Sequence, residues 1–280
     1  MNPSDALEQT IARTCELPAM PQVASRVLAL MEDPKTSAMD LQRVISTDPG
    51  LTTRVLKIAN SAFYSTGRSV ETVSAAVVRM GFQTLRSLVV AACVQGLYRR
   101  VGLAEQKLWE HAVGVAATAH VLAQTLGMPR LEEAFTAGLL HDVGKSVLHQ
   151  GDPDRYAQVM EQVYNEGAWA HEVEMEIYGF THAQVGGVVI RRWRLPEALE
   201  QVVWGHHDPS RVDAAYRDMA ALVHVADLVC LGMGVGIQTP RPVPLYDSGA
   251  AQALALTPQV VEAVRGALPM AMAQAMEAFA

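Results

Sequence analysis

The chain has 280 residues, of which 50% are hydrophobic and 18% are charged, and its formal net charge is −7. This balance is ordinary for a globular protein and argues against a nucleic-acid binder that neutralises many phosphates. Its three cysteines are isolated and its N-terminus is polar and acidic, which indicates reduced thiols in a cytoplasmic protein without a signal peptide. The longest apolar run, around residues 87–94, is too short to span a bilayer, so we expect no membrane contact.

The periodicity of apolar residues is helical almost everywhere. In residues 22–32, for example, Val23, Val27 and Leu30 fall on one helical face. No sustained alternation of apolar and polar residues occurs, and no Asn-Gly hairpin signal is present. The sequence therefore predicts an all-α fold.

Several helix boundaries are marked by capping residues. Ser37, with Asp40 three positions later, resembles a capping box, and Asp48 followed by proline predicts another helix start. Ser69 similarly precedes the next expected helix, and Gly81 is expected to end it.

Two interruptions divide the chain. The polar segment 97–107 and the proline-rich segment 237–249 break the helical pattern. We therefore expect an N-terminal helical-bundle subdomain over 1–100, a second helical subdomain over 101–235, and a proline-rich loop with a C-terminal helix over 236–280.

Residues 138–145 read GLLHDVGK and place His141 beside Asp142 at an expected helix end. Adjacent residues on a helix do not face each other, so a mutual hydrogen bond explains the pair poorly. Near a helix end both side chains can converge on a metal, because imidazole and carboxylate are good ligands for iron, manganese or zinc. A buried pair without a ligand stays the alternative.

A second pair, His206 and His207, follows an apolar stretch at another expected helix end. Such a pair indicates a metal or phosphate site, with an exposed loop pair as the alternative. Asp227 lies in a helix that is apolar nearly all round, where a carboxylate is costly unless it is paired or coordinated. Its simplest partner is His224, three residues earlier on the same face, which we take as a structural residue.

Three further histidines lie in expected helices. His111 shares a stripe with apolar residues, His120 points away from that stripe, and His182 opens a helix that contains two adjacent glycines. Each alone is expected in the core or at a cap. Together with the pairs above, the order His, His-Asp, His, His-His, Asp offers ligands for one or two octahedral metal ions with open positions for water.

These patterns carry a family resemblance. GLLHDVGK resembles the signature of the HD superfamily of helical metal-dependent phosphohydrolases. Over about residues 10–235 the chain resembles more specifically the HDOD family, the HD-related output domains of bacterial signalling. The stretches that carry it are LPAMPQVASRVLALM, ISTDPGLTTRVLKIANSAFYS, VSAAVVRMGFQTLRSLVV, LWEHAVGVA, GLLHDVGK, THAQVGGVVIRRWRLPEAL and HHDPS. The resemblance implies an HD-like second subdomain and a regulatory or scaffolding role.

The ligand order is also similar to that of the HD-GYP phosphodiesterases, which cleave cyclic di-GMP. That resemblance implies that Lys145 lies near a substrate phosphate. It implies as metal ligands His111, His141, Asp142, His182, His206, His207 and Asp227. Two departures argue against a trinuclear site and a cyclic dinucleotide substrate. The GYP segment is missing after the double histidine, and Lys107 stands where some of those enzymes carry a glutamate ligand.

Two functions follow from these observations. The first is a regulatory output protein that acts by binding a signalling protein or a phosphate-containing small ligand. The alternative is a metal-dependent phosphohydrolase that uses one or two iron or manganese ions, with Asp142 and Lys145 as catalytic residues. We expect the Met-rich C-terminal helix to pack back on the body of the protein, with a homodimer contact as the alternative. We expect no nucleic-acid partner. Arg191, Arg192 and Arg194 are expected to form a solvated helix face, with a phosphate path as the alternative.

Overall fold

The computed structural model describes residues 3–61, 69–98, 102–236, 240, 242–243, 245–246 and 248–279. Within these residues the chain is all-α, as predicted, and no strand is found. The elements in chain order are α1 (Pro3–Thr14), α2 (Gln22–Met31), α3 (Ala38–Ile45), α4 (Pro49–Ala59), α5 (Val73–Val94), η1 (Gln95–Tyr98), α6 (Leu103–Thr125), α7 (Leu131–Leu140), α8 (Val143–Gly151), α9 (Pro153–Asn165), α10 (Ala170–Tyr178), α11 (His182–Arg192), α12 (Glu197–Gly205), η2 (Pro209–Arg211), α13 (Arg217–Met233), α14 (Gly249–Ala253) and α15 (Pro258–Phe279).

The capping residues of the first lobe act largely as the sequence predicts. Ser37 and Asp40 form a reciprocal capping box at α3, and the Asp48 carboxylate accepts the backbone N–H of Leu51 at α4. The expectation for Ser69 was wrong, because α5 begins after Thr72, whose hydroxyl accepts the backbone N–H of Ala75. Ser69 instead precedes a short extended link to the helix.

Helix α5 bends sharply at Gly81, whose φ of 83° and ψ of 169° are almost exclusive to glycine. It is the single described helix long and apolar enough, by length and composition, to cross a membrane, and 61% of that window is buried inside the protein. This length is reached only across Gly81, whose non-helical backbone separates two helical segments. The straight part after the kink, residues 82–94, is shorter than a bilayer requires.

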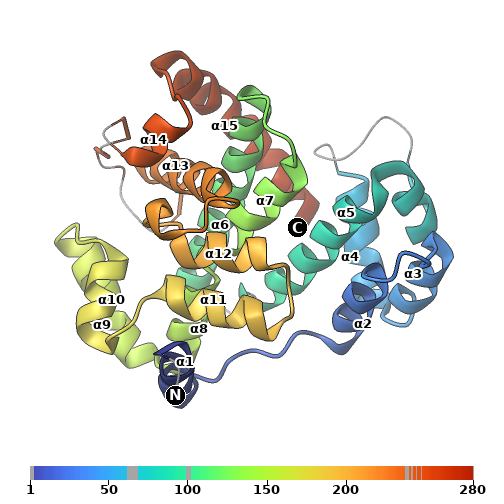
Figure 1. Ribbon diagram of the computed structural model, residues 1–280, viewed down its shortest axis with the longest axis horizontal. Helices are drawn as coiled ribbons and strands as arrows, with labels where there is room; N and C mark the ends of the chain where they lie inside the picture. The colour runs from blue at the N-terminus through green and yellow to red at the C-terminus, as the bar shows by residue number, and fades with distance from the viewer. Residues whose placement is uncertain are drawn as a thin grey trace.

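Two groups of helices form two lobes (Figure 1). In the first, α3 and α4 pack against α5. In the second, α6 packs against α7, α13 and α15, while α11 packs against α8 and α12. Helix α5 also contacts α7, so it joins the two lobes through one continuous apolar core.

Helix α1 lies apart from α2–α4 and rests against the second lobe (Figure 1), where Glu8 approaches Arg191 and Arg192 of α11. The indole N–H of Trp193 donates to the carbonyl of Pro18 at 2.8 Å, just beyond α1. A Cβ added to Gly151 would meet the Cβ of Cys15 at 2.5 Å, which shows how closely this segment approaches α8. The N-terminal segment is therefore attached to the lobe that contains the site described next.

A candidate metal centre in the second lobe

The His141–Asp142 pair lies where the chain passes from α7 into α8. His141 caps α7, and Asp142 leaves the helical conformation with φ −102° and ψ 12° before α8 begins. His141 is fully buried and Asp142 is 2% exposed. This break turns the carboxylate toward the imidazole, so that Nε2 of His141 lies 3.3 Å from Oδ2 of Asp142.

Histidines from three other elements surround the same carboxylate. Nε2 of His182, at the start of α11, lies 3.1 Å from Oδ1 of Asp142. Nε2 of His206, after α12, lies 3.9 Å from Oδ1, and Nε2 of His111, in α6, lies 3.6 Å from Oδ2. The carboxylate of Asp142 is therefore the centre of the cluster.

The two remaining sequence candidates complete the cluster from its edges. Asp227, in α13, places Oδ1 3.1 Å from Nε2 of His111. Nε2 of His207 lies 2.8 Å from Nε2 of His182. The structure thus brings together all seven residues that the resemblance implies as ligands, although their role as ligands stays a prediction.

The outward nitrogen of each buried ring is held by a hydrogen bond. Nδ1 of His141 donates to the carbonyl of Gly138 at 2.6 Å, and Nδ1 of His206 donates to the carbonyl of Val203 at 2.7 Å. Because a carbonyl only accepts, Nδ1 carries the proton in both rings and Nε2 of the neutral ring presents a lone pair. His111 is held in the same way, with Nδ1 3.0 Å from the carbonyl of Val235.

The Nε2 atoms that point into the cluster are suited to bind a metal ion. Nε2 of His141 and Nε2 of His206 are buried, and neither has a hydrogen-bond partner among the described residues. A buried, unsatisfied polar atom is costly, and a bound cation would satisfy both lone pairs at once. Two groups bring their ligand atoms within 4.8 Å of one another, namely His111, His141 and Asp142, and His182, His206 and His207. The residues present therefore fit one or two divalent ions.

The charges in the cluster are strongly coupled. Burial raises the pKa of Asp142, but His141, Lys145 and His182 outweigh it and hold that pKa well below its usual range. Burial likewise opposes the charge of Lys145, yet Asp142 and Asp227 keep the pKa of this lysine raised. Both groups therefore remain charged at neutral pH.

In contrast to Asp142 and Lys145, the side chains of His206 and His207 favour their uncharged form. Burial, reinforced by the neighbouring imidazoles, lowers the pKa of each ring well below its usual value. Both rings are therefore neutral at pH 7, which is the form that binds a metal ion.

Lys145 lies in the first turn of α8, three residues after Asp142. Its Nζ lies 2.6 Å from Oδ2 of Asp142, and its side chain is 14% exposed. The ammonium group is therefore largely buried and pairs directly with the central carboxylate.

Sequence reasoning missed two residues of this site. Glu174, in α10, is fully buried, and its Oε2 accepts hydrogen bonds from the backbone N–H and from Nδ1 of His182 at 2.7 and 2.5 Å. His171 stacks on His207 with ring centroids 4.2 Å apart. The sequence offered no signal that singles out Glu174, because α10 carries other acidic and histidine positions.

Two expected alternatives are also resolved. The simplest partner of Asp227 was expected to be His224, but that ring contacts the carbonyl of His206 at 2.8 Å, and Asp227 approaches His111 instead. Arg191 pairs with Glu200 at 2.6 Å, as expected of a residue on a solvated helix face. The proposed phosphate path through this arginine is therefore not supported.

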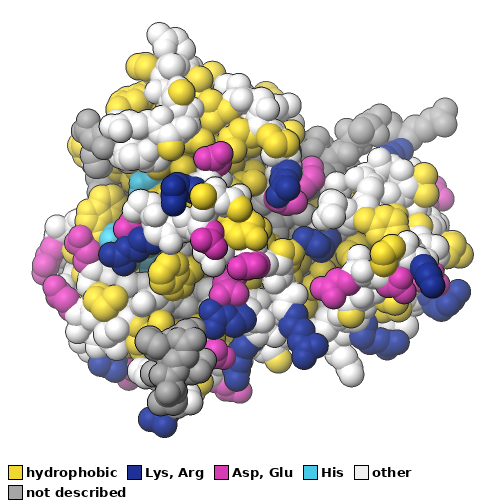
Figure 2. Space-filling model, viewed as in Figure 1, with side chains coloured by type: hydrophobic (Ala, Val, Ile, Leu, Met, Phe, Trp, Pro, Cys, Tyr) yellow, Lys and Arg dark blue, Asp and Glu magenta, His cyan; other side chains and the backbone are white. Residues whose placement is uncertain are grey.

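The cluster opens to the surface beside His171 and His207. These two residues line a cavity of ≈ 610 Å³ together with Thr181, Trp204 and Arg211. A neighbouring cavity of ≈ 310 Å³ is also lined by both histidines and reaches Asp227. Figure 2 shows histidine side chains at this surface, beside acidic and basic residues.

The fold and the cluster define a two-lobed helical protein with a buried histidine–aspartate centre, and its family follows from comparison with known proteins. The model of the HDOD domain matches residues 17–209, so the chain belongs to the HDOD family. The resemblance found in the sequence is thereby confirmed.

Two solved structures are similar over nearly the whole chain. An HDOD domain protein of unknown function from Geobacter sulfurreducens has a TM-score of 0.81 at 25% identity, covering 99% of this chain and 98% of that chain. A protein described as a candidate phosphohydrolase, from Shewanella amazonensis SB2B, has a TM-score of 0.75 at 28% identity, covering 98% of each chain.

Curated relatives are similar over shorter regions. An uncharacterised protein of Treponema pallidum (strain Nichols) is 24% identical over 217 residues, which are 77% of this chain and 42% of that protein. Ribonuclease Y of Thermus thermophilus is 30% identical over 122 residues, which are 44% of this chain and 16% of that enzyme. The chain thus spans less than half the length of these relatives.

Proposed function

We propose that this HDOD protein binds a divalent metal at the Asp142 cluster and hydrolyses a phosphoester there, as part of bacterial signal transduction. The observation that carries the proposal is the convergence of five histidines and two aspartates on one buried point. The inward nitrogens of His141 and His206 make no hydrogen bond in the described part of the chain, and both face the Asp142 carboxylate. A bound divalent ion would satisfy both buried nitrogens, which supports a metal at this point.

Each residue of the cluster has a distinct role in the proposed hydrolysis. When bound, the metal lowers the pKa of a coordinated water and polarises a phosphoryl oxygen. Lys145 attracts the phosphate as a point charge beside Asp142. Asp142 neutralises charge at the centre, Glu174 orients His182, and the apolar packing around His141 excludes bulk water.

The names of two similar proteins support this reaction class. One structure with 28% identity is described as a candidate phosphohydrolase, and a curated relative over 44% of this chain is a ribonuclease. Both names concern phosphoester hydrolysis. The substrate of this chain is proposed only as a phosphoester, because the acidic overall balance of −7 disfavours a long nucleic acid.

Hydrolysis of bis(p-nitrophenyl) phosphate by the full chain, supplied with manganese or iron(II), tests the proposal. We expect turnover that Asp142→Asn lowers by about 10²-fold or more, because the central ligand and its charge are lost. Asp213→Asn, at an exposed aspartate outside the cluster, serves as the matched control and keeps full activity. Equal rates in the two variants would remove the site from the reaction.

The second candidate is a regulatory module that binds a signalling protein without turnover. It is favoured by exposed apolar side chains on the first lobe, where Val78 is 82% exposed and Phe82, just beyond the Gly81 kink, is 36% exposed. A protein that holds its metal and shows no turnover with generic phosphomonoesters and phosphodiesters would favour this candidate.

A further inference from the structure

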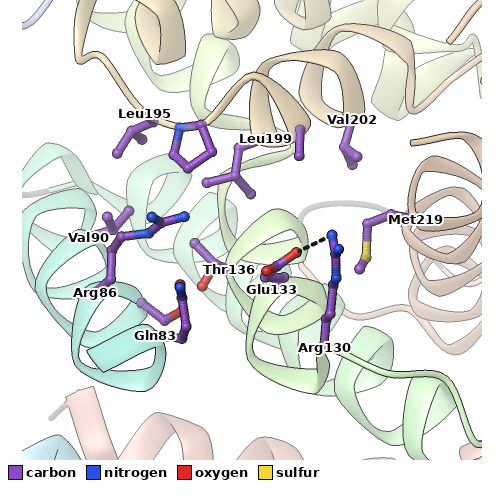
Figure 3. Close-up of a pocket in the computed structure, with 13 residues that line it drawn as sticks. Gln83, Arg86, Val90, Arg130, Glu133, Thr136, Leu195, Leu199, Val202 and Met219 are labelled. Carbon is purple, nitrogen blue, oxygen red and sulfur yellow. Dashed lines mark hydrogen bonds and ion pairs between the residues drawn. The ribbon is translucent and has the colours of Figure 1, made fainter. Parts of the chain in front are cut away.

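A third cavity lies between the lobes, and none of the seven residues of the metal cluster lines it. It has a volume of ≈ 170 Å³ and is enclosed by α5, α7, α12 and the start of α13 (Figure 3). One wall is apolar and is formed by Leu195, Pro196, Leu199, Val202 and Met219. The opposite wall carries Gln83, Arg86, Arg130, Glu133 and Thr136.

The two arginines of this cavity differ in their partners. Arg130 lies 3.4 Å from Oε2 of Glu133, which compensates both charges. Arg86 is half-buried, and in the described part of the chain it makes no ion pair and no hydrogen bond; its guanidinium extends toward the apolar wall (Figure 3). A partly desolvated guanidinium without an acceptor is unfavourable, and carboxylate and phosphate groups match its geometry.

The size and the lining of the cavity restrict what can occupy it. An apolar cavity of about 150 Å³ in another protein accommodates benzene, so this one is large enough for a single aromatic ring or a short aliphatic chain. One apolar wall and one free cation together select a ligand that is apolar at one end and anionic at the other.

We propose that this cavity binds a small organic anion, whose carboxylate or phosphate accepts hydrogen bonds from Arg86 while its apolar part packs on Leu195 and Leu199. The site is separate from the proposed hydrolytic centre. Its ligand would contact α5 from the first lobe together with α7 and α12, the two helices that end at His141 and His206.

Titration of the full chain with benzoate, phenyl phosphate and benzyl alcohol tests this assignment. We expect at least one of the two anions to bind saturably, with a Kd on the order of 1 mM for so small a ligand. The preferred anion distinguishes a carboxylate from a phosphate ligand. Arg86→Met should weaken anion binding by about tenfold or more, because only the charged group is removed.

Two controls locate the binding. Arg26→Met, at an exposed arginine of α2, should bind like the wild type. His141→Ala should also retain anion binding, so that failure of the metal centre leaves this result unaffected. Absence of saturable binding for both anions, unchanged affinity in Arg86→Met, or equal affinity for benzyl alcohol would each overturn the assignment.

Discussion

Glu174 determines how His182 presents its second nitrogen. The carboxyl group is fully buried and accepts a hydrogen bond from Nδ1 of His182 at 2.5 Å. With Nδ1 protonated, Nε2 of the neutral ring carries the lone pair, and it lies 3.1 Å from Asp142 and 2.8 Å from Nε2 of His207. A carboxylate behind a metal-binding histidine fixes the ring and raises its basicity.

Replacing Glu174 by glutamine should therefore weaken metal binding by about 10- to 100-fold. The amide retains the shape but cannot supply the charge that supports the ring. The measurement is a competition titration of manganese or zinc with a chromogenic chelator. Glu172→Gln, at an exposed position of the same helix, is the control and should match the wild type. Identical affinities in both variants would show that Glu174 has no influence on the centre.

At the residue scale, the sequence predicted the members of the cluster better than the residues that hydrogen-bond to them. His141 and Asp142 could be identified because a polar pair interrupts an apolar run. Glu174 could not, because its helix also carries three other acidic or histidine positions that are exposed or half-buried, and only the tertiary fold distinguishes it. The partner of Asp227 was missed for the same reason, since His111 lies far away in the sequence.

At the scale of elements, the crossing of α8 and α11 brings Asp142 to His182. A Cβ added to Gly144 would meet the carbonyl oxygen of His182 at 2.0 Å, and one added to Gly186 would meet a methyl group of Val203 at 2.7 Å. The two helices therefore approach each other backbone to backbone. Glycine at position 144 is required by this contact and not by backbone conformation.

Gly144→Ala should lower the free energy of unfolding by about 1–3 kcal/mol or more, because the backbones must separate. Urea unfolding followed by circular dichroism measures the change. Gly266→Ala is the matched control in α15, where an added Cβ meets nothing within 4 Å, and it should be neutral or stabilising by up to about 1 kcal/mol. Equal stability of the two variants would contradict the close crossing.

Helix boundaries show what local sequence can determine. The capping box at Ser37 and the cap at Asp48 were predicted correctly because each bonds within four residues. The start of α5 was placed too early, at Ser69, because Thr72 offers an equally good cap and the sequence does not say which is used. Helix crossings depend on distant residues, so the role of Gly144 was not predictable from spacing.

At the scale of the whole molecule, the centre depends on the folding of almost the entire second lobe. Its side chains come from α6, the α7–α8 junction, α11, the end of α12 and α13, and Glu174 adds α10. The HDOD match over residues 17–209 extends through the double histidine but ends before Asp227. The proposed division at residue 100 stays a prediction, while α1 and α5 tie the two lobes together.

The central claim is that this lobe holds a divalent metal, and the metal content of the purified chain tests it most directly. Protein prepared without chelator and reconstituted with iron(II) or manganese should contain about one or two ions per chain. His120→Ala, on the same helix as His111 but outside the cluster, should keep that content, whereas His141→Ala should lose most of it. Wild-type protein that takes up no metal, or a His141→Ala variant with undiminished content, would contradict the account.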